Sequence, residues 1–453
     1  MKKFFLDNVV LMLIFIVMIL IVFFAWGSKE EKRLISLPKI EISLNETTLD
    51  EIISNSKDIK YDDNLVIVFD GGKYDEYSRV ELKGRGNSTW GQSKSPFQIK
   101  FKEKVDLFGM GKAKKWILLA NYFDATSLRN DIAFYLEKVL GEAYALEGRF
   151  VELYVDGKCL GIYYLTEKIE IGKERVNLKD DYGVIVEVEN MRSEDVNCYL
   201  TVDSTCLTMR DVVVDSNAKV AMERFRDEFE QLENAAREGD YERVQQLVDV
   251  DSLAVYYLLS EFTVNPDAYA SSFYFYKDGD GDLIHAGPGW DFDFAMGNKE
   301  WVWGYSEDFY LPETVDALKT QSLGGEIRDN KTGKSSKAKK KSAVSDLLFN
   351  LIEIPEFQRK VIQIYRERMM GKKEDVLAYI RKQAAIIATA TANDNNIWRK
   401  DEADKVKSVL YDNLSPSLVF WREVTYLTDW VDRRFEYMDK MYSGRIQTES
   451  REI

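Results

Sequence analysis

The sequence predicts an α+β fold with a sheet-rich N-terminal part and a mostly helical C-terminal part. Residues 40–44 and 97–101 alternate apolar and polar side chains with the period of two that is typical of half-buried strands. Residues 345–442 are predicted to be mostly helical. Strands that come early in a chain and helices that come late favour an α+β domain. The 453 residues are enough for a large two-lobed domain.

Turn and cap residues place the other elements of the sheet-rich part. Asp156-Gly157 joins two apolar runs and predicts a hairpin. A helix is expected over 128–140, because apolar residues fall on one of its faces and Gly141 can end it. Asp124 or Thr126 can cap its first turn. Further strands are expected at 65–69, 80–82, 116–120, 150–155, 160–165 and 184–188, followed by a helical stretch over 217–263.

Two polar stretches interrupt the later part of the chain. Residues 272–276 and 283–285 are predicted to pair as a hairpin across the acidic turn 278–282. This turn resembles a calcium loop, but Leu283 occupies the position where such a loop needs glycine, and no liganding Glu follows. A hairpin turn is therefore predicted. Residues 322–343 are rich in lysine and poor in apolar residues, which indicates a flexible surface insertion.

The N-terminus carries an unbroken apolar run over residues 9–26. At about 1.5 Å per residue, these 18 residues reach roughly 27 Å, which is close to the thickness of a bilayer core. We expect a transmembrane anchor here rather than a cleaved signal peptide, whose apolar core is shorter. Residues 1–8 then form a short tail and 27–37 a linker. The main domain, 38–445, is expected to be exported and therefore extracytoplasmic, and 446–453 form a C-terminal tail.

Composition excludes several classes of function. The net charge of −15 disfavours nucleic-acid binding, which needs clustered Lys and Arg. The sequence has one histidine, His285, so it cannot build a zinc site from several histidines. The cysteines show no CxxC spacing and imply no disulfide framework, although one bridge remains open. Acid-base chemistry is therefore expected to rest on carboxylates.

An acidic doublet offers the clearest chemistry. Asp291 and Asp293 are predicted to follow a strand directly, and in an extended stretch two such side chains point the same way. Their oxygens can share Mg²⁺ or Mn²⁺ with phosphate oxygens, although an acidic loop start explains the pair equally well. Asp267 lies 24 residues upstream, ahead of the predicted hairpin. A hairpin that folds back can bring Asp267 to the same cleft, where it would accept a hydroxyl proton; a cap or turn role is the alternative.

A second polar segment, residues 83–90, precedes the strand over 97–101. It combines two glycines with Arg85 and short hydroxyl and amide side chains, and two lysines follow at Lys94 and Lys100. Glycines let backbone N–H groups approach an anion, and Arg and Lys neutralise its charge. The segment therefore indicates phosphate binding, with a polar turn that contains a structural Arg as the alternative.

Several motifs, taken in order, resemble the CotH (spore coat protein H) kinase family. Each is short, but their shared order is far more specific than any one of them. The resemblance covers roughly residues 60–300 and part of the C-terminal helices. Its motifs are Arg85–Trp90 with Lys94–Phe101, Lys115–Asp124 with Ser127–Asn130, Gly161–Ile169, Asn265–Asp267, Trp290–Asp293 with Gly297, and Pro355–Phe357.

The resemblance implies an atypical protein-kinase-like, two-lobed fold that binds ATP with Mg²⁺ or Mn²⁺. The implied activity is transfer of the γ-phosphate to Ser or Thr of envelope or coat proteins. Lys100, inside the alternating strand, is preferred over Lys94 as the residue that holds the nucleotide phosphates. The other roles that it implies are metal binding by Asp291 and Asp293, catalysis by Asp267, shaping of the nucleotide pocket by Arg85, Asn87 and Ser88, and pairing with the lysine or lining of the adenine edge by Glu167.

Two other functions compete with the kinase. The first is a non-catalytic assembly or binding protein that keeps the fold at a surface polysaccharide or a coat layer. A scaffold, however, has no need for three carboxylates around one cleft. The second is a glycoside hydrolase, which needs two carboxyl groups flanking a sugar. Two Asp only two residues apart fit metal binding better.

Overall fold

A computed structural model describes residues 36–189, 199–203, 205–265, 268, 271–298, 326–328, 335–337, 346–398 and 416–449. The predicted anchor at 9–26, the linker up to residue 35 and Asp267 lie outside these residues. Within the described part of the chain, no helix combines the length and apolar character needed to cross a membrane.

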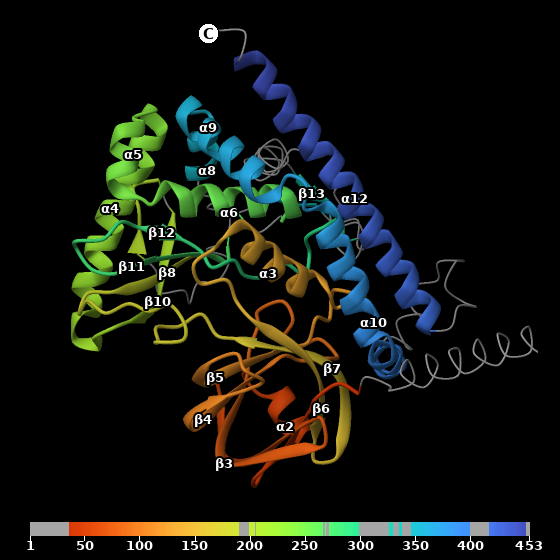
Figure 1. Ribbon diagram of the computed structural model, residues 1–453. Helices are drawn as coiled ribbons and strands as arrows, with labels where there is room; N and C mark the ends of the chain where they lie inside the picture. The colour runs from red at the N-terminus through yellow and green to blue at the C-terminus, as the bar shows by residue number, and fades with distance from the viewer. Residues whose placement is uncertain are drawn as a thin grey trace, which may run out of the picture.

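The N-terminal part is a closed β-barrel, drawn in red to yellow at the bottom of Figure 1. Neighbouring strands follow the order β1-β2-β3-β4-β5-β7-β6, and β1 closes the barrel by pairing in parallel with β6. A short helix, α2 (Leu49–Ser54), lies between the first two strands. The strands are β1 (Lys39–Ser43), β2 (Lys60–Asp70), β3 (Lys73–Gly84), β4 (Phe97–Asp106), β5 (Lys112–Leu119), β6 (Gly148–Val155) and β7 (Lys158–Glu167).

Alternation along each strand separates the inside of the barrel from its outside. On β4, Phe97, Ile99 and Phe101 are almost fully buried and belong to the barrel core. Lys100 lies between two of them in sequence and therefore points outward. On β5, Ile117 also points outward, yet it is buried in the larger core of the rest of the molecule. This part of the outer barrel face is therefore covered by the second part of the chain.

The second part begins with helix α3 (Arg129–Leu140) and a five-stranded sheet of order β12-β11-β8-β10-β9. The sequence-predicted helix over 128–140 is confirmed: Asp124 accepts a hydrogen bond from the Arg129 amide at 2.9 Å, and Gly141 ends the helix in a left-handed conformation. The sheet and its covering helices are β8 (Val184–Glu189), β9 (Tyr199–Leu200), β10 (Cys206–Val212), η1 (Asp215–Asn217), α4 (Ala218–Glu238), α5 (Tyr241–Leu247), α6 (Val250–Thr263), β11 (Phe273–Lys277) and β12 (His285–Ala286).

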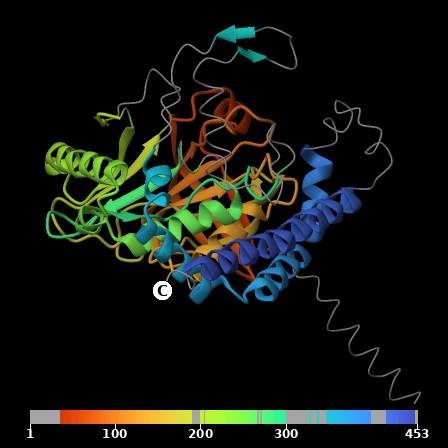
Figure 2. The same ribbon diagram turned by 90° about the horizontal axis from the view of Figure 1, so that it is seen from above.

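The C-terminal part is helical, as predicted. Helices α10 and α12 run side by side along one edge of the molecule in both views (Figures 1 and 2). The elements are α8 (Leu347–Ile352), α9 (Pro355–Ile364), the π-helical turn η2 (Tyr365–Met369), α10 (Lys373–Trp398) and α12 (Pro416–Glu449). The predicted α+β class, with a sheet-rich front and a helical back, is thus confirmed.

The predicted Lys-rich insertion, 322–343, contains two short strands. β13 (Glu326–Arg328) and β14 (Ser335–Lys337) pair antiparallel. The other residues of this insertion lie outside the described part of the chain.

Candidate active site

The turn between β3 and β4 packs directly against the acidic segment. The Arg85 guanidinium lies over the Trp290 ring, 4.9 Å from its centroid, which is close enough for a cation–π contact. Gly86 has φ +85°, and a Cβ at this position would lie only 2.2 Å from the Thr89 hydroxyl, so the turn requires glycine. The two polar segments that the sequence singled out therefore meet in space, although more than 200 residues separate them.

Lys57 stabilises this turn through two hydrogen bonds. Its ammonium donates to Gly86 O at 2.7 Å and to the side-chain oxygen of Asn87 at 2.5 Å. Asn87 and Ser88 are themselves exposed at the tip of the turn. Their predicted role in shaping a nucleotide pocket stays a prediction, and Arg85 is the residue of this turn that faces the acidic doublet.

The acidic doublet has a different backbone from the one expected. Asp291 has φ +69°, in the left-handed region, and β12 ends five residues earlier, so the expectation of an extended stretch directly after a strand was wrong. The two carboxyl groups nevertheless share a hydrogen bond across this turn. Burial raises the pKa of Asp291, while the bond to Asp293, the charge of Arg85 and a bond from Ser272 lower it in part.

The hairpin that precedes the doublet folds back onto it. β11 and β12 pair antiparallel, as predicted. The Asn265 side-chain amide donates to Asp291 O at 3.4 Å, and the Ser272 hydroxyl lies 3.5 Å from Asp291 Oδ2. Asn265 stands two residues before Asp267, so its hydrogen bond to Asp291 supports the predicted approach of this turn to the doublet. The Asp267 carboxyl itself lies outside the described residues.

The second sheet adds a tyrosine and a glutamate that sequence reasoning missed. Tyr274 on β11 stands opposite Glu187 on β8, and the two side chains are hydrogen-bonded. Arg210 forms an ion pair with the same glutamate. Burial lowers the pKa of Arg85, and the nearby Tyr274 and then Asp291 raise it in part, so these groups lie in one neighbourhood. A glutamate inside the apolar run 184–188 is the signal that could have marked this position.

Three lysines lie in succession between this cluster and the outer face of the barrel: Lys168, Lys115 and Lys100. Strand register places Lys100 on β4 opposite both Glu81 and Lys115. Lys115 and Lys168 bind Glu170, at 3.0 and 3.8 Å. Burial lowers the pKa of Lys168, as does the nearby charge of Arg85. Arg85 therefore lies near Lys168 on one side and near Asp291 on the other, and cations of this kind can neutralise a phosphate ligand.

Comparison with protein families gives a match that spans most of the chain. A family model described as CotH kinase protein matches residues 82–438. The chain belongs to the CotH kinase family. Among curated proteins, no match is found. The resemblance predicted from the ordered motifs is thus confirmed.

The doublet of this CotH domain fits a hard cation. Among the described residues, no three His, Cys, Asp or Glu side chains gather into a metal cage. Mg²⁺, however, is commonly held by one or two carboxylates together with substrate phosphates and water. Asp291 and Asp293, with the Ser272 hydroxyl beside them, supply that oxygen-rich kind of donor set.

The two candidate lysines occupy different environments in the CotH domain. The Lys94 ammonium is buried and donates to Ile162 O at 2.5 Å and to Asp394 Oδ1 at 2.7 Å. Asp394 also accepts from the Ile162 amide at 3.0 Å, so this ion pair ties α10 to β7. The Lys100 side chain is 38% exposed and 3.8 Å from Glu81. Lys94 is thus engaged inside the fold, whereas Lys100 remains available to a ligand.

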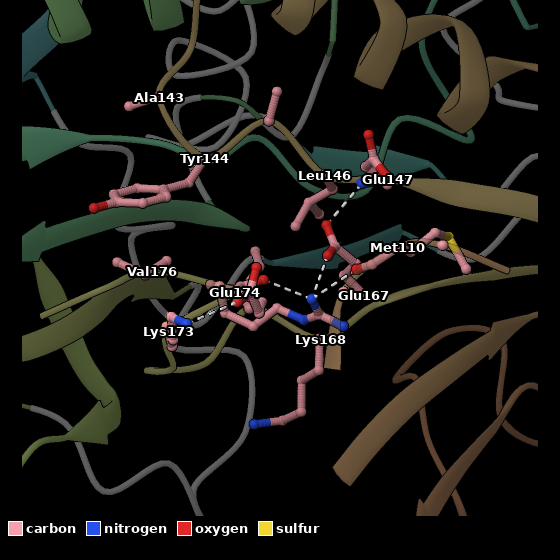
Figure 3. Close-up of a pocket in the computed structure, with 15 residues that line it drawn as sticks. Met110, Ala143, Tyr144, Leu146, Glu147, Glu167, Lys168, Lys173, Glu174 and Val176 are labelled. Carbon is pink, nitrogen blue, oxygen red and sulfur yellow. Dashed lines mark hydrogen bonds and ion pairs between the residues drawn. The ribbon is translucent and has the colours of Figure 1, made fainter. Parts of the chain in front are cut away.

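Glu167 lines a cavity of about 410 Å³ between the barrel and the segment that follows β7 (Figure 3). Its carboxyl pairs with Arg175 at 2.5 Å and accepts from the Glu147 amide at 2.8 Å. Burial raises its pKa to about 7, against the lowering effect of Arg175. Glu167 was predicted either to pair with the lysine or to line the adenine edge; the structure pairs it with Arg175, and the second role stays a prediction. Lys168 also lines this cavity, and it shares Glu170 as an ion-pair partner with Lys115.

Helix α3 carries a buried acid whose titration should be measurable. Asp131 accepts hydrogen bonds from the Tyr164 and Tyr379 hydroxyls at 2.9 and 3.0 Å. Burial raises its pKa from 3.8 to about 6. A folded-state pKa above the unfolded value stabilises the fold fully below about pH 4, and this stabilisation is lost as the pH rises through 6.

We therefore expect Asp131→Asn to stabilise the protein by about 2–3 kcal/mol at pH 8, and by about half as much at pH 5. The Asn oxygen can still accept from the tyrosines, and its side chain carries no charge at either pH. Urea unfolding of the full-length protein in detergent at both pH values measures the difference. The exposed Asp375 provides the control, since Asp375→Asn should show no such pH dependence. An equal effect of Asp131→Asn at both pH values would contradict the prediction.

Proposed function

We propose that this chain is an atypical metal-dependent protein kinase that transfers the γ-phosphate of ATP to Ser or Thr of envelope or coat proteins. One observation carries the proposal: Arg85 lies on Trp290, directly beside the hydrogen-bonded pair Asp291 and Asp293. A cation from the barrel and a pair of carboxylates from the second part of the chain thus meet at one place. Phosphoryl transfer needs this combination of charges.

Family membership and local charge support the assignment of a nucleotide. Lys100 on the barrel and Lys168 just after β7 would provide positive charge for the phosphates. We place the base in the cavity beside Glu167, whose volume of about 410 Å³ suits a small ligand. Asp291 and Asp293 would hold Mg²⁺ or Mn²⁺, and the bound ion would neutralise charge on the phosphate oxygens.

The proposed reaction joins the acceptor oxygen to the γ-phosphorus. The bond between that phosphorus and the oxygen bridging to the β-phosphate breaks, and ADP leaves. Asp267 is the proposed acceptor of the hydroxyl proton. Arg85 would stabilise negative charge on the transferred group from the barrel side, because its guanidinium already faces Asp291.

We also propose that the main domain acts outside the cytoplasm, anchored by residues 9–26. The apolar run in the sequence supports the anchor. Cys206 is fully buried and disulfide-bonded, whereas Cys159 is free. Disulfides persist in oxidising compartments and are rare in the cytosol. The substrate would then be a protein of the envelope or of a coat layer.

The test is phosphate transfer by the full-length protein in detergent. With γ-labelled ATP and Mg²⁺ or Mn²⁺, label is expected on the protein itself or on Ser/Thr-rich acceptor peptides, and chelation of the metal should abolish it. Phosphoamino-acid analysis would identify the acceptor residue. Absence of labelled product with either metal, together with absence of ATP binding, would contradict the kinase and favour a scaffold that keeps the fold.

A further inference from the structure

Side chains of helix α3 form hydrogen bonds with the loop that carries Asp291, on both sides of that residue. The Glu137 carboxyl accepts from the Gly289 amide at 2.5 Å, and the Asn130 side-chain oxygen accepts from the Phe292 amide at 2.9 Å. Arg129, one residue earlier on the helix, donates to Ala295 O at 2.8 Å. Figure 1 shows α3 at the centre of the molecule, between the barrel and α6.

Glu137 lies so close to Gly289 that a residue with a side chain at position 289 would collide with it. A Cβ on Gly289 would lie 2.8 Å from Glu137 Oε1, so a larger residue would push the carboxyl away. Glu137 is buried, with 1% of its surface exposed, and so is Asn130, with 5%. A buried carboxyl group needs a hydrogen-bond donor to offset its loss of water, and the Gly289 amide supplies one.

Asp291 needs such support, because its left-handed backbone is unfavourable for a residue with a side chain. A conformation of this kind costs about 1–3 kcal/mol and persists only where neighbouring contacts determine it. Here α3 holds the residue two positions before the strained Asp291 and the residue immediately after it, and the Asn265 side-chain amide donates to the Asp291 carbonyl itself. The helix therefore fixes the direction of the Asp291 side chain through the backbone.

We propose that Glu137 and Asn130 are positioning residues that hold the Asp291–Asp293 doublet in its ligand-binding geometry. This inference rests on the proposed function for the role of the doublet, but the backbone restraint can be tested without it. Neither residue is among those proposed to hold the metal or the nucleotide. Their contribution would be to keep two carboxylates together in the absence of a ligand, so that less rearrangement accompanies metal binding.

Hydrogen exchange in the full-length protein tests the restraint directly. In Glu137→Leu, exchange of the amides in residues 287–298 should accelerate at least about tenfold, because Gly289 loses its acceptor. Glu137→Gln keeps an acceptor oxygen and should restore protection. Asn130→Ala should act like Glu137→Leu, with exchange increased at Phe292, and serves if the first variant does not fold. Unchanged exchange in both Glu137→Leu and Asn130→Ala would overturn the proposal.

A matched control separates positioning from general loss of stability. Glu233 is also buried, but it binds Thr205 at 2.6 Å from helix α4. Glu233→Leu should leave exchange of 287–298 unchanged. Titration with Mn²⁺ measures the effect on metal binding: Glu137→Leu should weaken Mn²⁺ binding about tenfold, whereas Glu233→Leu should not. If the wild-type protein binds no Mn²⁺, the proposed function loses its metal, while the exchange result still decides the positioning role. Equal effects of both Leu variants on exchange would indicate a structural role only and contradict the proposal.

Discussion

Asp291→Asn is expected to lower phosphoryl transfer by about 10³-fold while leaving the fold intact. Loss of one preorganised electrostatic group in an active site typically costs about 10²–10³ in rate, and Asp291 is proposed to bind the metal as well. Asn adopts the left-handed backbone as readily as Asp, so φ +69° is retained. The bond to Asp293 can also be kept, since the Asn amide donates to a carboxylate. The substitution thus removes the charge and little else.

Two measurements on the full-length protein check this expectation. Transfer of label from ATP should fall as stated, and Mn²⁺ affinity should fall in parallel. Asp280→Asn is the matched control: Asp280 is an exposed acid of the β11–β12 turn that pairs with Arg224 at 2.6 Å. This variant should keep wild-type transfer. Transfer by Asp291→Asn within tenfold of wild type would show that the doublet does not carry the reaction.

Local patterns predicted the strands of the barrel but not its closure. Alternation along β4 follows directly from Phe97, Ile99 and Phe101, and Asp156-Gly157 marks the β6–β7 turn without knowledge of the rest of the chain. Closure depends on β1 pairing with β6, where Ile40 stands opposite Leu153. No local pattern encodes such a pairing between distant residues.

The candidate site shows the same limit. The acidic doublet and Arg85 were found because each stands in a recognisable motif. The left-handed backbone of Asp291 was missed because contacts from α3 and Asn265 determine it, not its own neighbours in sequence. Glu187 was missed for a similar reason, since its partner Tyr274 lies far along the chain. Lys94 and Lys100 could not be distinguished by spacing alone, because the Asp394 that engages Lys94 lies 300 residues away.

Arg434→Met is expected to lower the free energy of unfolding by about 3–5 kcal/mol. Arg434 on α12 and Glu261 on α6 form an ion pair at 2.8 Å in which both side chains have no exposed surface. Arg434 also donates to the carbonyls of Glu261 and Phe262 near the end of α6. Without the guanidinium, Glu261 would be left as a buried charge that has lost its counterion, which is the costly outcome.

Removing both charges should recover most of that loss, because the penalty comes from the uncompensated carboxylate and not from absence of the pair. Urea unfolding, followed by circular dichroism, should therefore place Arg434→Met with Glu261→Leu much closer to wild type than Arg434→Met alone. Arg359→Met removes an exposed partner of Glu356 and should cost less than about 1 kcal/mol. Because α6 leads into Asn265, the single variant should also speed exchange across residues 287–298. A loss no larger than that of Arg359→Met would mean that α12 does not secure the helix on which the candidate site depends.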